Sequence, residues 1–257
     1  MDRFFRINYE FDREQVHREI EQQMSCEGSN YICVADGVIA NVAHRTPEYL
    51  KVVNEGMFAI CDSSYVPMYI RMIYGKRFQQ YCGSQIFEDV IKSRKYRMIF
   101  LGTQQRILDA LQQNLMQWNP DVADMTFHEL PFCKISEFDY PGIARMIEED
   151  GADIVWVALG APKQEFFMNM LKPYLHHGVM IAVGAAFKFF SGLDEKRAPK
   201  WMVKRHMEFI YRLSQDPKKQ MKRCGWIVAT LPQMLFNEWK TKIHNSNTHE
   251  SSGLLPD

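Results

Sequence analysis

The sequence predicts a Rossmann-like α/β fold, in which a parallel sheet has helices on both faces and is followed by a basic, helical C-terminal appendage. Three observations predict it. Short apolar runs alternate with amphipathic segments along most of the 257 residues. Two of these runs, DIVWVAL and VMIAV, have the continuous apolar pattern of strands that are buried on both faces. Basic side chains are concentrated near the C-terminus.

The individual elements follow from this alternation, because βαβ units place a helix between successive parallel strands. Strands are expected at residues 31–35, 58–61, 97–101, 153–159 and 179–183, and helices at residues 47–54, 105–118, 141–149 and 164–171. Turn residues separate several of them, such as Gly102-Thr103 after the third strand and Asp150-Gly151 before the fourth.

Charge is unevenly distributed, although the whole chain is neutral with 31 basic and 31 acidic residues. Residues 198–244 hold ten Lys or Arg against three acids, a net charge of +7 that leaves −7 on the remainder. We therefore divide the chain into an α/β core over residues 1–195, a basic amphipathic appendage over 196–244 and a polar tail over 245–257 that is expected to be disordered. Overall neutrality argues against a nucleic-acid binder that depends on bulk charge.

The appendage combines its charge with apolar side chains that are suited to a membrane interface, where basic neighbours meet anionic headgroups. These side chains are Trp226, Ile227, Leu231, Leu235, Phe236 and Trp239. A helix packed on the body or a dimer contact is the alternative. No apolar run is long enough to span a bilayer, and the charged N-terminus lacks the apolar stretch of a secretory signal. A cytoplasmic location, peripheral on the inner face of the cell membrane, is therefore expected.

The familiar catalytic and metal-binding motifs are absent from the sequence. The six cysteines form no C-x-x-C pair, so we expect no metal site. There is no H-E-x-x-H, G-x-S-x-G, P-loop or G-x-G-x-x-G motif. Zinc protease, serine hydrolase, NTPase and classical dehydrogenase functions therefore lose their usual support.

Candidate residues are sought in the turns after the predicted strands, because open parallel sheets bind ligands beyond the carboxyl ends of their strands. The most distinctive turn is GAPKQE at residues 160–165. Pro162 preorganises a helix start, and the helix N-terminus offers N–H groups to an anion. Gln164 can hydrogen-bond a sugar hydroxyl, and Glu165 can cap or orient its neighbours. An ordinary strand-to-helix turn is the alternative, but six specific residues together favour a site.

Two further turns are ambiguous on their residues alone. Asp62, after the second predicted strand, suits either a general base or a helix N-cap, and the cap is the commoner use. The small residues of Gly184-Ala185-Ala186 allow either close approach of a ligand or tight packing of a helix on the sheet, with equal weight.

Three blocks of sequence together resemble the WecG/TagA/CpsF family of bacterial glycosyltransferases. They are GAPKQE, then V-G-x-x-F with S-G-L and R-A-P-K-W, and then E-x-x-Y-R-L followed by Pro and Arg. The resemblance extends from about Val34 to about Arg223. It implies an inverting enzyme, with no metal or other cofactor, that moves N-acetylmannosamine or a related hexose from a UDP donor to a polyprenyl-diphosphate-linked sugar in surface polysaccharide biosynthesis.

The resemblance also implies roles for single residues. Asp62 falls at the family's proposed catalytic Asp, which reverses the preference for a cap. Arg212 and Arg223 match arginines thought to hold the nucleotide diphosphate when the appendage meets the membrane. The expected substrate-binding residues are Asp36, Gly83, Ser84, Gly102, Thr103, Gly160, Pro162, Lys163, Gln164, Glu165, Gly184, Arg212, Lys219 and Arg223.

The chain departs from the family pattern at several of these places. Asp36 stands where Asn is usual, Lys188 where Asp is common and Lys219 where Arg is frequent. These departures leave the donor sugar open. They also support an alternative function, that of a non-catalytic nucleotide-sugar-binding partner subunit of a polysaccharide-synthesis complex. Self-association is expected as well, because an exposed apolar appendage needs cover away from a membrane.

Overall fold

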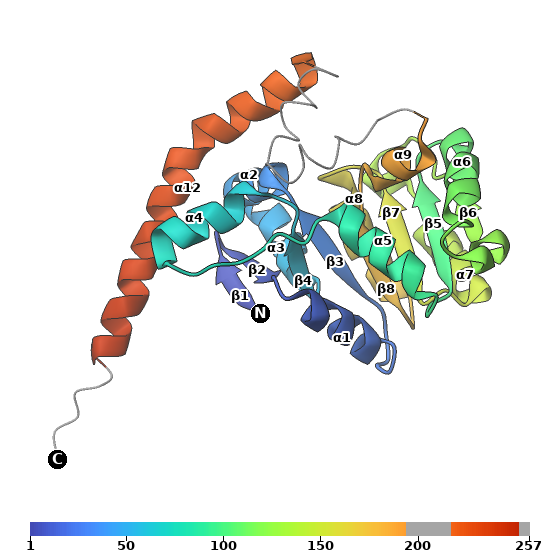
Figure 1. The fold of residues 1–257 in the computed structure, drawn as a ribbon, viewed down its shortest axis with the longest axis horizontal. Helices are drawn as coiled ribbons and strands as arrows, with labels where there is room; N and C mark the ends of the chain where they lie inside the picture. The colour runs from blue at the N-terminus through green and yellow to red at the C-terminus, as the bar shows by residue number, and fades with distance from the viewer. Residues whose placement is uncertain (194–216, 252–257) are drawn as a thin grey trace.

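A computed structural model of the chain describes residues 1–193 and 217–251, without the side chains of residues 218–220, 222–224, 226 and 245–251. A single sheet forms the centre, helices cover it, and a long C-terminal helix lies along one side (Figure 1). The predicted α/β fold with a helical C-terminal segment is therefore confirmed.

The sheet has eight strands in the order β1-β2-β4-β3-β8-β7-β5-β6. All pairs are parallel except β1 with β2, which is antiparallel. The strands are β1 (Asp2–Phe4), β2 (Ile7–Glu10), β3 (Asn30–Ala35), β4 (Phe58–Cys61), β5 (Met98–Gly102), β6 (Thr126–His128), β7 (Ile154–Ala158) and β8 (Val179–Ala182). The five predicted strands are confirmed, whereas β1, β2 and β6 were not predicted.

The helices predicted from the apolar spacing are α3, α6, α7 and α8, and the others were not placed individually. The α-helices are α1 (Arg13–Gln23), α2 (Gly37–Arg45), α3 (Pro47–Glu55), α4 (Tyr65–Tyr74), α5 (Gly83–Ser93), α6 (Gln105–Leu115), α7 (Tyr140–Asp150), α8 (Lys163–Leu171), α9 (Ala186–Ser191) and α12 (Pro217–Ser251). The short 3₁₀ helices are η1 (Pro120–Asp124), η2 (Ile135–Glu137) and η3 (Lys172–Tyr174).

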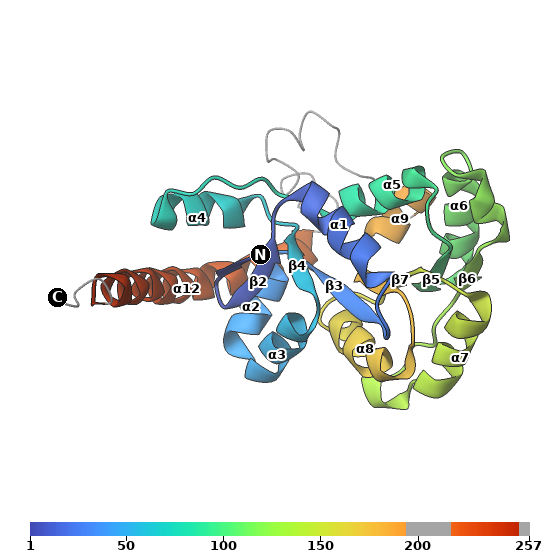
Figure 2. The same ribbon diagram turned by 90° about the horizontal axis from the view of Figure 1, so that it is seen from below.

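The core lies in two layers, one on each face of the sheet. Alternate residues of β3 divide between them: Tyr31 and Cys33 belong to one layer, and Ile32 and Val34 to the other. Helices α2, α3, α7 and α8 contribute to the first layer, and α1, α5, α6 and α9 to the second (Figure 2). Each face of the sheet is therefore covered, which explains why its central strands read as continuous apolar runs.

Helix α12 is longer than the sequence indicates. The appendage was expected to end at His244 and to be followed by a disordered tail, but the helix continues to Ser251. Residues 252–257 and the first part of the appendage, up to residue 216, lie outside the described residues. The division into core, appendage and tail stays a prediction. Within the described parts of the chain, every helix is too short or too polar to cross a membrane.

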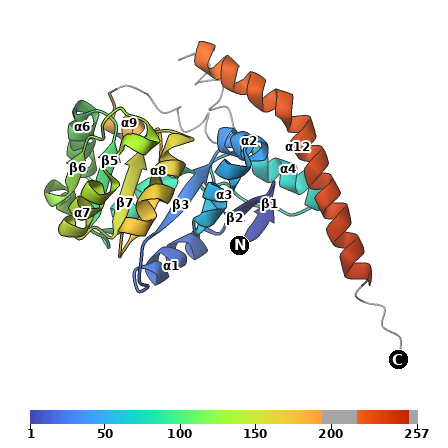
Figure 3. The same ribbon diagram turned by 180° about the vertical axis from the view of Figure 1, so that it is seen from behind.

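Helix α12 packs on α2 and α4 and reaches the N-terminal hairpin (Figure 3). The buried carboxylate of Glu238 accepts hydrogen bonds from the backbone N–H of Phe5 and the hydroxyl of Tyr74, both at 2.8 Å. Burial raises the pKa of Glu238. Asn41 of α2 donates a hydrogen bond to Thr230 of α12. Buried polar contacts thus fix the position of α12 at two separate points.

Replacing Glu238 by Ala is expected to loosen α12, because the Phe5 N–H would lose its buried acceptor. An unsatisfied buried donor costs about 1–3 kcal/mol. Faster hydrogen exchange along α12 and a lower free energy of unfolding in urea would register this loss. The control is Glu238→Gln, whose carboxamide oxygen still accepts the Phe5 N–H. Equal exchange rates in wild type and Glu238→Ala would show that this contact does not hold the helix.

Candidate functional site

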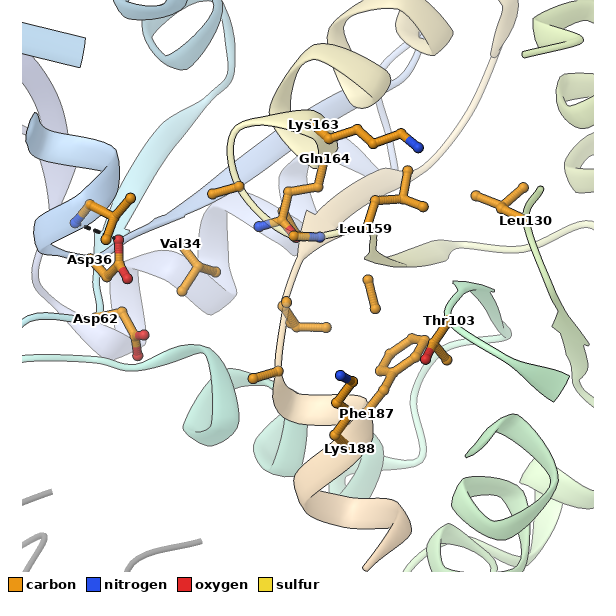
Figure 4. A pocket seen from close by; sticks show the side chains of 18 of the residues that line it. Val34, Asp36, Asp62, Thr103, Leu130, Leu159, Lys163, Gln164, Phe187 and Lys188 are labelled. Atoms are coloured by element: carbon orange, nitrogen blue, oxygen red, sulfur yellow. Dashed lines mark hydrogen bonds between the residues drawn. The ribbon is translucent and has the colours of Figure 1, made fainter. Parts of the chain in front are cut away.

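The main cleft lies at the carboxyl ends of the central strands and has a volume of about 890 Å³. Its lining includes the ends of β3, β7 and β8 and the residues that follow β4 and β5 (Figure 4). Strand β3 lies between β4 and β8, so the chain leaves it toward one side of the sheet and returns much later on the other. Such a switch point in an open α/β sheet is where ligands bind.

Seven of the predicted site residues line this cleft, and they come from five different segments. They are Asp36, Asp62, Thr103, Gly160, Lys163, Gln164 and Gly184. The structure therefore brings together most of the turns that the strand-end argument selected. Arg212 lies outside the described residues, and Lys219 and Arg223 lie on α12 with side chains that are not described.

The carboxylate of Asp62 is positioned by two neighbouring segments. Its backbone N–H donates to the carbonyl of Ala35 at 3.0 Å, and its Oδ1 accepts from the N–H of Gly83, the first residue of α5, at 3.0 Å. The positive end of the α5 dipole favours the ionised carboxylate. Asp62 does not cap the helix that follows it, because Ser63 Oγ accepts the N–H groups of the first turn of α4.

Asp36 has the capping role that was first considered for Asp62. Its Oδ1 accepts from the N–H groups of Val38 and Ile39, both at 2.9 Å, at the start of α2. These two bonds and the helix dipole offset part of its charge. A carboxylate at this place in the cleft is therefore compatible with an anionic ligand nearby.

The GAPKQE segment is braced by its own side chains. Gln164 Oε1 accepts from the N–H of Gly160 at 3.0 Å, and Gln164 Nε2 donates to Glu165 Oε1 at 2.9 Å. Glu165 is fully buried, and burial raises its pKa to about 7. Pro162 precedes α8 as its N-cap residue rather than standing in its first turn. Glu165 thus orients its neighbour Gln164, which is one of the two roles expected of it.

The turn after β5 needs glycine at position 102. Gly102 has a φ of +111°, and a Cβ on it would lie 2.7 Å from the carbonyl oxygen of Ala158 on the neighbouring strand. Thr103, which follows it with a φ of +56°, lines the cleft. The close approach of two backbones here places the Thr103 side chain at the cleft wall.

Gly102→Ala is expected to destabilise the fold by more than the about 1–3 kcal/mol that a residue held in a sparsely populated backbone conformation usually costs. The clash with Ala158 also displaces β5 from β7 at the cleft. Urea unfolding of the variant measures the loss. Gly151→Ala is the control, because Gly151 also has a positive φ but a Cβ there would meet nothing within 4 Å. Equal losses in the two variants would mean that the approach to Ala158 adds nothing.

The turn after β8 both lines the cleft and packs on the core. Gly184 and Ala185 line the cleft, whereas Ala186 is buried in the core. Lys188, two residues later, also lines the cleft, and its side chain points into it (Figure 4). Its ammonium has no hydrogen bond or ion pair with any residue that the structure describes. Lys188 is therefore available to an anionic ligand.

Gly83 and Ser84 lie at the start of α5 and outside the cleft lining. Gly83 supplies the N–H that Asp62 accepts, and the hydroxyl of Ser84 lies 3.2 Å from the sulfur of Cys82. Lys163 lines the cleft, where its ammonium donates to the carbonyl of Cys133 at 2.6 Å. The ammonium group of Lys163 therefore also fixes the position of the segment after β6.

Sequence reasoning missed three parts of the lining. The first is the segment 129–132 that follows β6, and the second is the inner face of α2. The third is Ile227 of α12, whose Cδ1 lies 3.3 Å from where a Cβ on Gly37 would be. The short TFH run of β6 was the available signal for the first of these. Among the described residues, no three His, Cys, Asp or Glu side chains are grouped as a metal ion would require.

The fold and the cleft together define a Rossmann-like α/β protein with a cleft at the switch point of its sheet. The model of the Glycosyl transferase WecG/TagA/CpsF family matches residues 4–248, almost the whole chain, and the chain belongs to this family. The resemblance noted in the GAPKQE and RAPKW blocks is thereby confirmed.

Three similar proteins have the name N-acetylglucosaminyldiphosphoundecaprenol N-acetyl-beta-D-mannosaminyltransferase. The Bacillus subtilis (strain 168) protein is 28% identical over 188 residues, which are 70% of this chain and 69% of the relative. The Bacillus spizizenii protein is 28% identical over 193 residues, or 74% and 72% of the two chains. The Staphylococcus aureus (strain MW2) protein is 23% identical over 215 residues, or 82% and 80%.

Proposed function

We propose that this chain is an inverting glycosyltransferase that moves N-acetylmannosamine or a related hexose from a UDP donor to a polyprenyl-diphosphate-linked sugar. The observation that carries the proposal is Asp62, an aspartate oriented by the N-terminus of α5 at the edge of a cleft of about 890 Å³. That volume lies within the range of small-molecule sites. The names of the relatives support a lipid-linked acceptor.

The proposed chemistry is a single displacement. Asp62 takes the proton from the acceptor hydroxyl while the hydroxyl oxygen forms a bond with the anomeric carbon of the donor. The bond from that carbon to the diphosphate breaks at the same time, and UDP leaves with the bonding electrons. Because attack and departure occur on opposite sides, the anomeric configuration inverts, and no second carboxylate nucleophile is needed.

Negative charge on the departing UDP must be stabilised by this chain's own groups if no metal takes part. We assign this role to Arg212, Lys219 and Arg223 of the C-terminal segment, as the family resemblance implies, and to N–H groups at helix starts. Lys188 adds a cation that already points into the cleft. Full transfer in the presence of EDTA would support metal independence.

Release of UDP from a panel of UDP-sugars, with and without a polyprenyl-diphosphate-GlcNAc acceptor, tests the whole proposal. Acceptor-dependent release from one donor would establish the transferase and identify its sugar. Measurable UDP binding without transfer to any acceptor would instead favour the non-catalytic partner subunit, which the departures at Asp36 and Lys188 support.

We further propose that α12 brings the enzyme to the inner face of the membrane. Phe236 and Trp239 are half exposed, as lipid contact requires. Leu231 and Leu235, which were expected to share this role, are only partly exposed, and Leu235 packs against the core. Phe236→Ser combined with Trp239→Ser is expected to lower sedimentation with anionic vesicles several-fold, and unchanged sedimentation would contradict this role.

A further inference from the structure

Helix α4 is apolar on two sides, although only one of them packs on the core. Val66 and Ile70 are buried, whereas Tyr65, Met68 and Met72 are 47%, 52% and 67% exposed. The exposed three have the spacing i, i+3 and i+7, so they form one stripe along the helix. A short helix with an apolar stripe on its outer side has a second surface that favours an apolar environment.

Helix α12 has an exposed apolar stripe of its own. Val228, Phe236, Trp239 and Ile243 are exposed, and their spacing places them on one side of the helix. Of the fourteen large apolar side chains that are exposed in the described part of the chain, eight lie on α4 and α12. The two helices pack against each other and project from the same side of the body (Figures 1 and 2). The two helices therefore belong to one region of the molecule, and each has an exposed apolar stripe.

The charges around this region indicate what it contacts. Arg71, Lys76 and Arg77 are exposed at the C-terminal end of α4, and Lys240 is exposed on α12. Lys76 forms an ion pair with Asp2 at 3.1 Å. Methionine and aromatic side chains beside a basic border fit an anionic lipid surface, where the apolar groups enter the headgroup boundary and the cations remain among the phosphates.

The position of α4 relative to Asp62 indicates how the apolar stripe of α4 could serve the reaction. Helix α4 begins at Tyr65, three residues after Asp62, which lines the cleft. The helix has ten residues and is therefore about 15 Å long. A hydroxyl carried on a membrane lipid would thus reach Asp62 most directly when the bilayer surface lies along α4.

We propose that α4 is a second membrane-contacting element beside α12, and that its exposed stripe rests on anionic lipid so that Asp62 faces the sugar of a lipid-linked acceptor. The use of Asp62 in this statement rests on the proposed function, whereas the contact of α4 with lipid does not. The sequence predicts membrane contact for the C-terminal appendage alone.

The test is the full-length Met68→Ser, Met72→Ser double variant. Both side chains are exposed, so the fold should tolerate the change, and an unchanged melting temperature checks this. Binding is measured by sedimentation with vesicles of phosphatidylcholine and phosphatidylglycerol. We expect binding to fall by about 100-fold, since removing one methionine from an apolar environment changes a partition coefficient by roughly tenfold and the variant removes two. Met116→Ser with Met170→Ser should leave binding unchanged, because these methionines are also exposed but lie elsewhere, at the C-cap of α6 and on α8.

The outcomes of this experiment separate membrane contact by α4 from the other possible roles of its stripe. Vesicle binding that is equal in both double variants overturns the proposal. Reduced self-association of the α4 variant, with vesicle binding intact, assigns the stripe to a second copy of the chain and also overturns it. An α4 variant that binds vesicles weakly but keeps its KM for a vesicle-embedded acceptor removes the link to Asp62. Lipid binding that depends on α4, in a wild-type protein that transfers no sugar, sustains the membrane contact and rejects the proposed function instead.

Discussion

Replacing Asp62 by Asn is expected to lower the rate of sugar transfer by about 10²–10⁴-fold, the usual contribution of a positioned general base. The substitution changes the chemistry and preserves the local structure. An asparagine oxygen can still accept the N–H of Gly83, which the carboxylate holds at 3.0 Å, so α5 keeps its contact. What is lost is the ability to take a proton from the acceptor hydroxyl.

The measurement is acceptor-dependent UDP release by wild type and variant at saturating donor. The matched control is Asp139→Asn, because Asp139 accepts the N–H of Gly142 at the start of α7 and lies outside the cleft lining. Asparagine caps helices as well as aspartate does, so this variant should transfer sugar at the wild-type rate. A similar rate for Asp62→Asn would move the base elsewhere while leaving the class of enzyme intact.

Glu165→Gln is expected to remove a pH dependence of stability worth about 3 kcal/mol. Burial raises the pKa of Glu165 from 4.5 to about 7, so the folded protein holds this proton at pH values where the unfolded chain has released it. Stability from this group is therefore fully present below pH 4.5 and is lost as the pH rises to about 7. Glutamine cannot ionise, and its oxygen still accepts from Gln164.

The free energy of unfolding in urea, measured at pH 5 and pH 8, tests this expectation. Between these values the wild type should lose about 2.5 kcal/mol relative to Glu165→Gln, because all other titrating groups are common to both proteins. Glu149→Gln, at an exposed position on α7, is the control and should follow the wild type. Parallel pH profiles for wild type and Glu165→Gln would mean that the carboxyl is hydrated in the folded protein.

The strands that could be predicted are those buried on both faces. Residues 153–159 and 179–183 are continuously apolar because helices cover both sides of β7 and β8, and this pattern identified them within about two residues. The hairpin of β1 and β2 and the edge strand β6 were missed. They have three or four residues each and lie at the ends of the sheet, so tertiary pairing rather than apolar periodicity forms them.

The candidate site was predictable where it is built from strand ends. Asp62, Thr103, Gly160 and Gly184 each follow a strand that the sequence indicates, and parallel strands bring such positions to one edge. The N-cap that was first considered for Asp62 is formed by Asp36, because which carboxylate meets which helix start depends on packing between segments. Asp62 meets α5, which begins 21 residues further along the chain.

The hydrogen bond between Glu238 and the N–H of Phe5 joins residues that are 233 positions apart. A ribosome makes Phe5 long before it makes Glu238. The surface that receives α12 is therefore complete before the helix itself exists, and the helix docks on a body that has already folded. The order of synthesis thus leaves the apolar residues of this docking surface uncovered until α12 is made, and this is a stage at which a newly made chain would be exposed to aggregation.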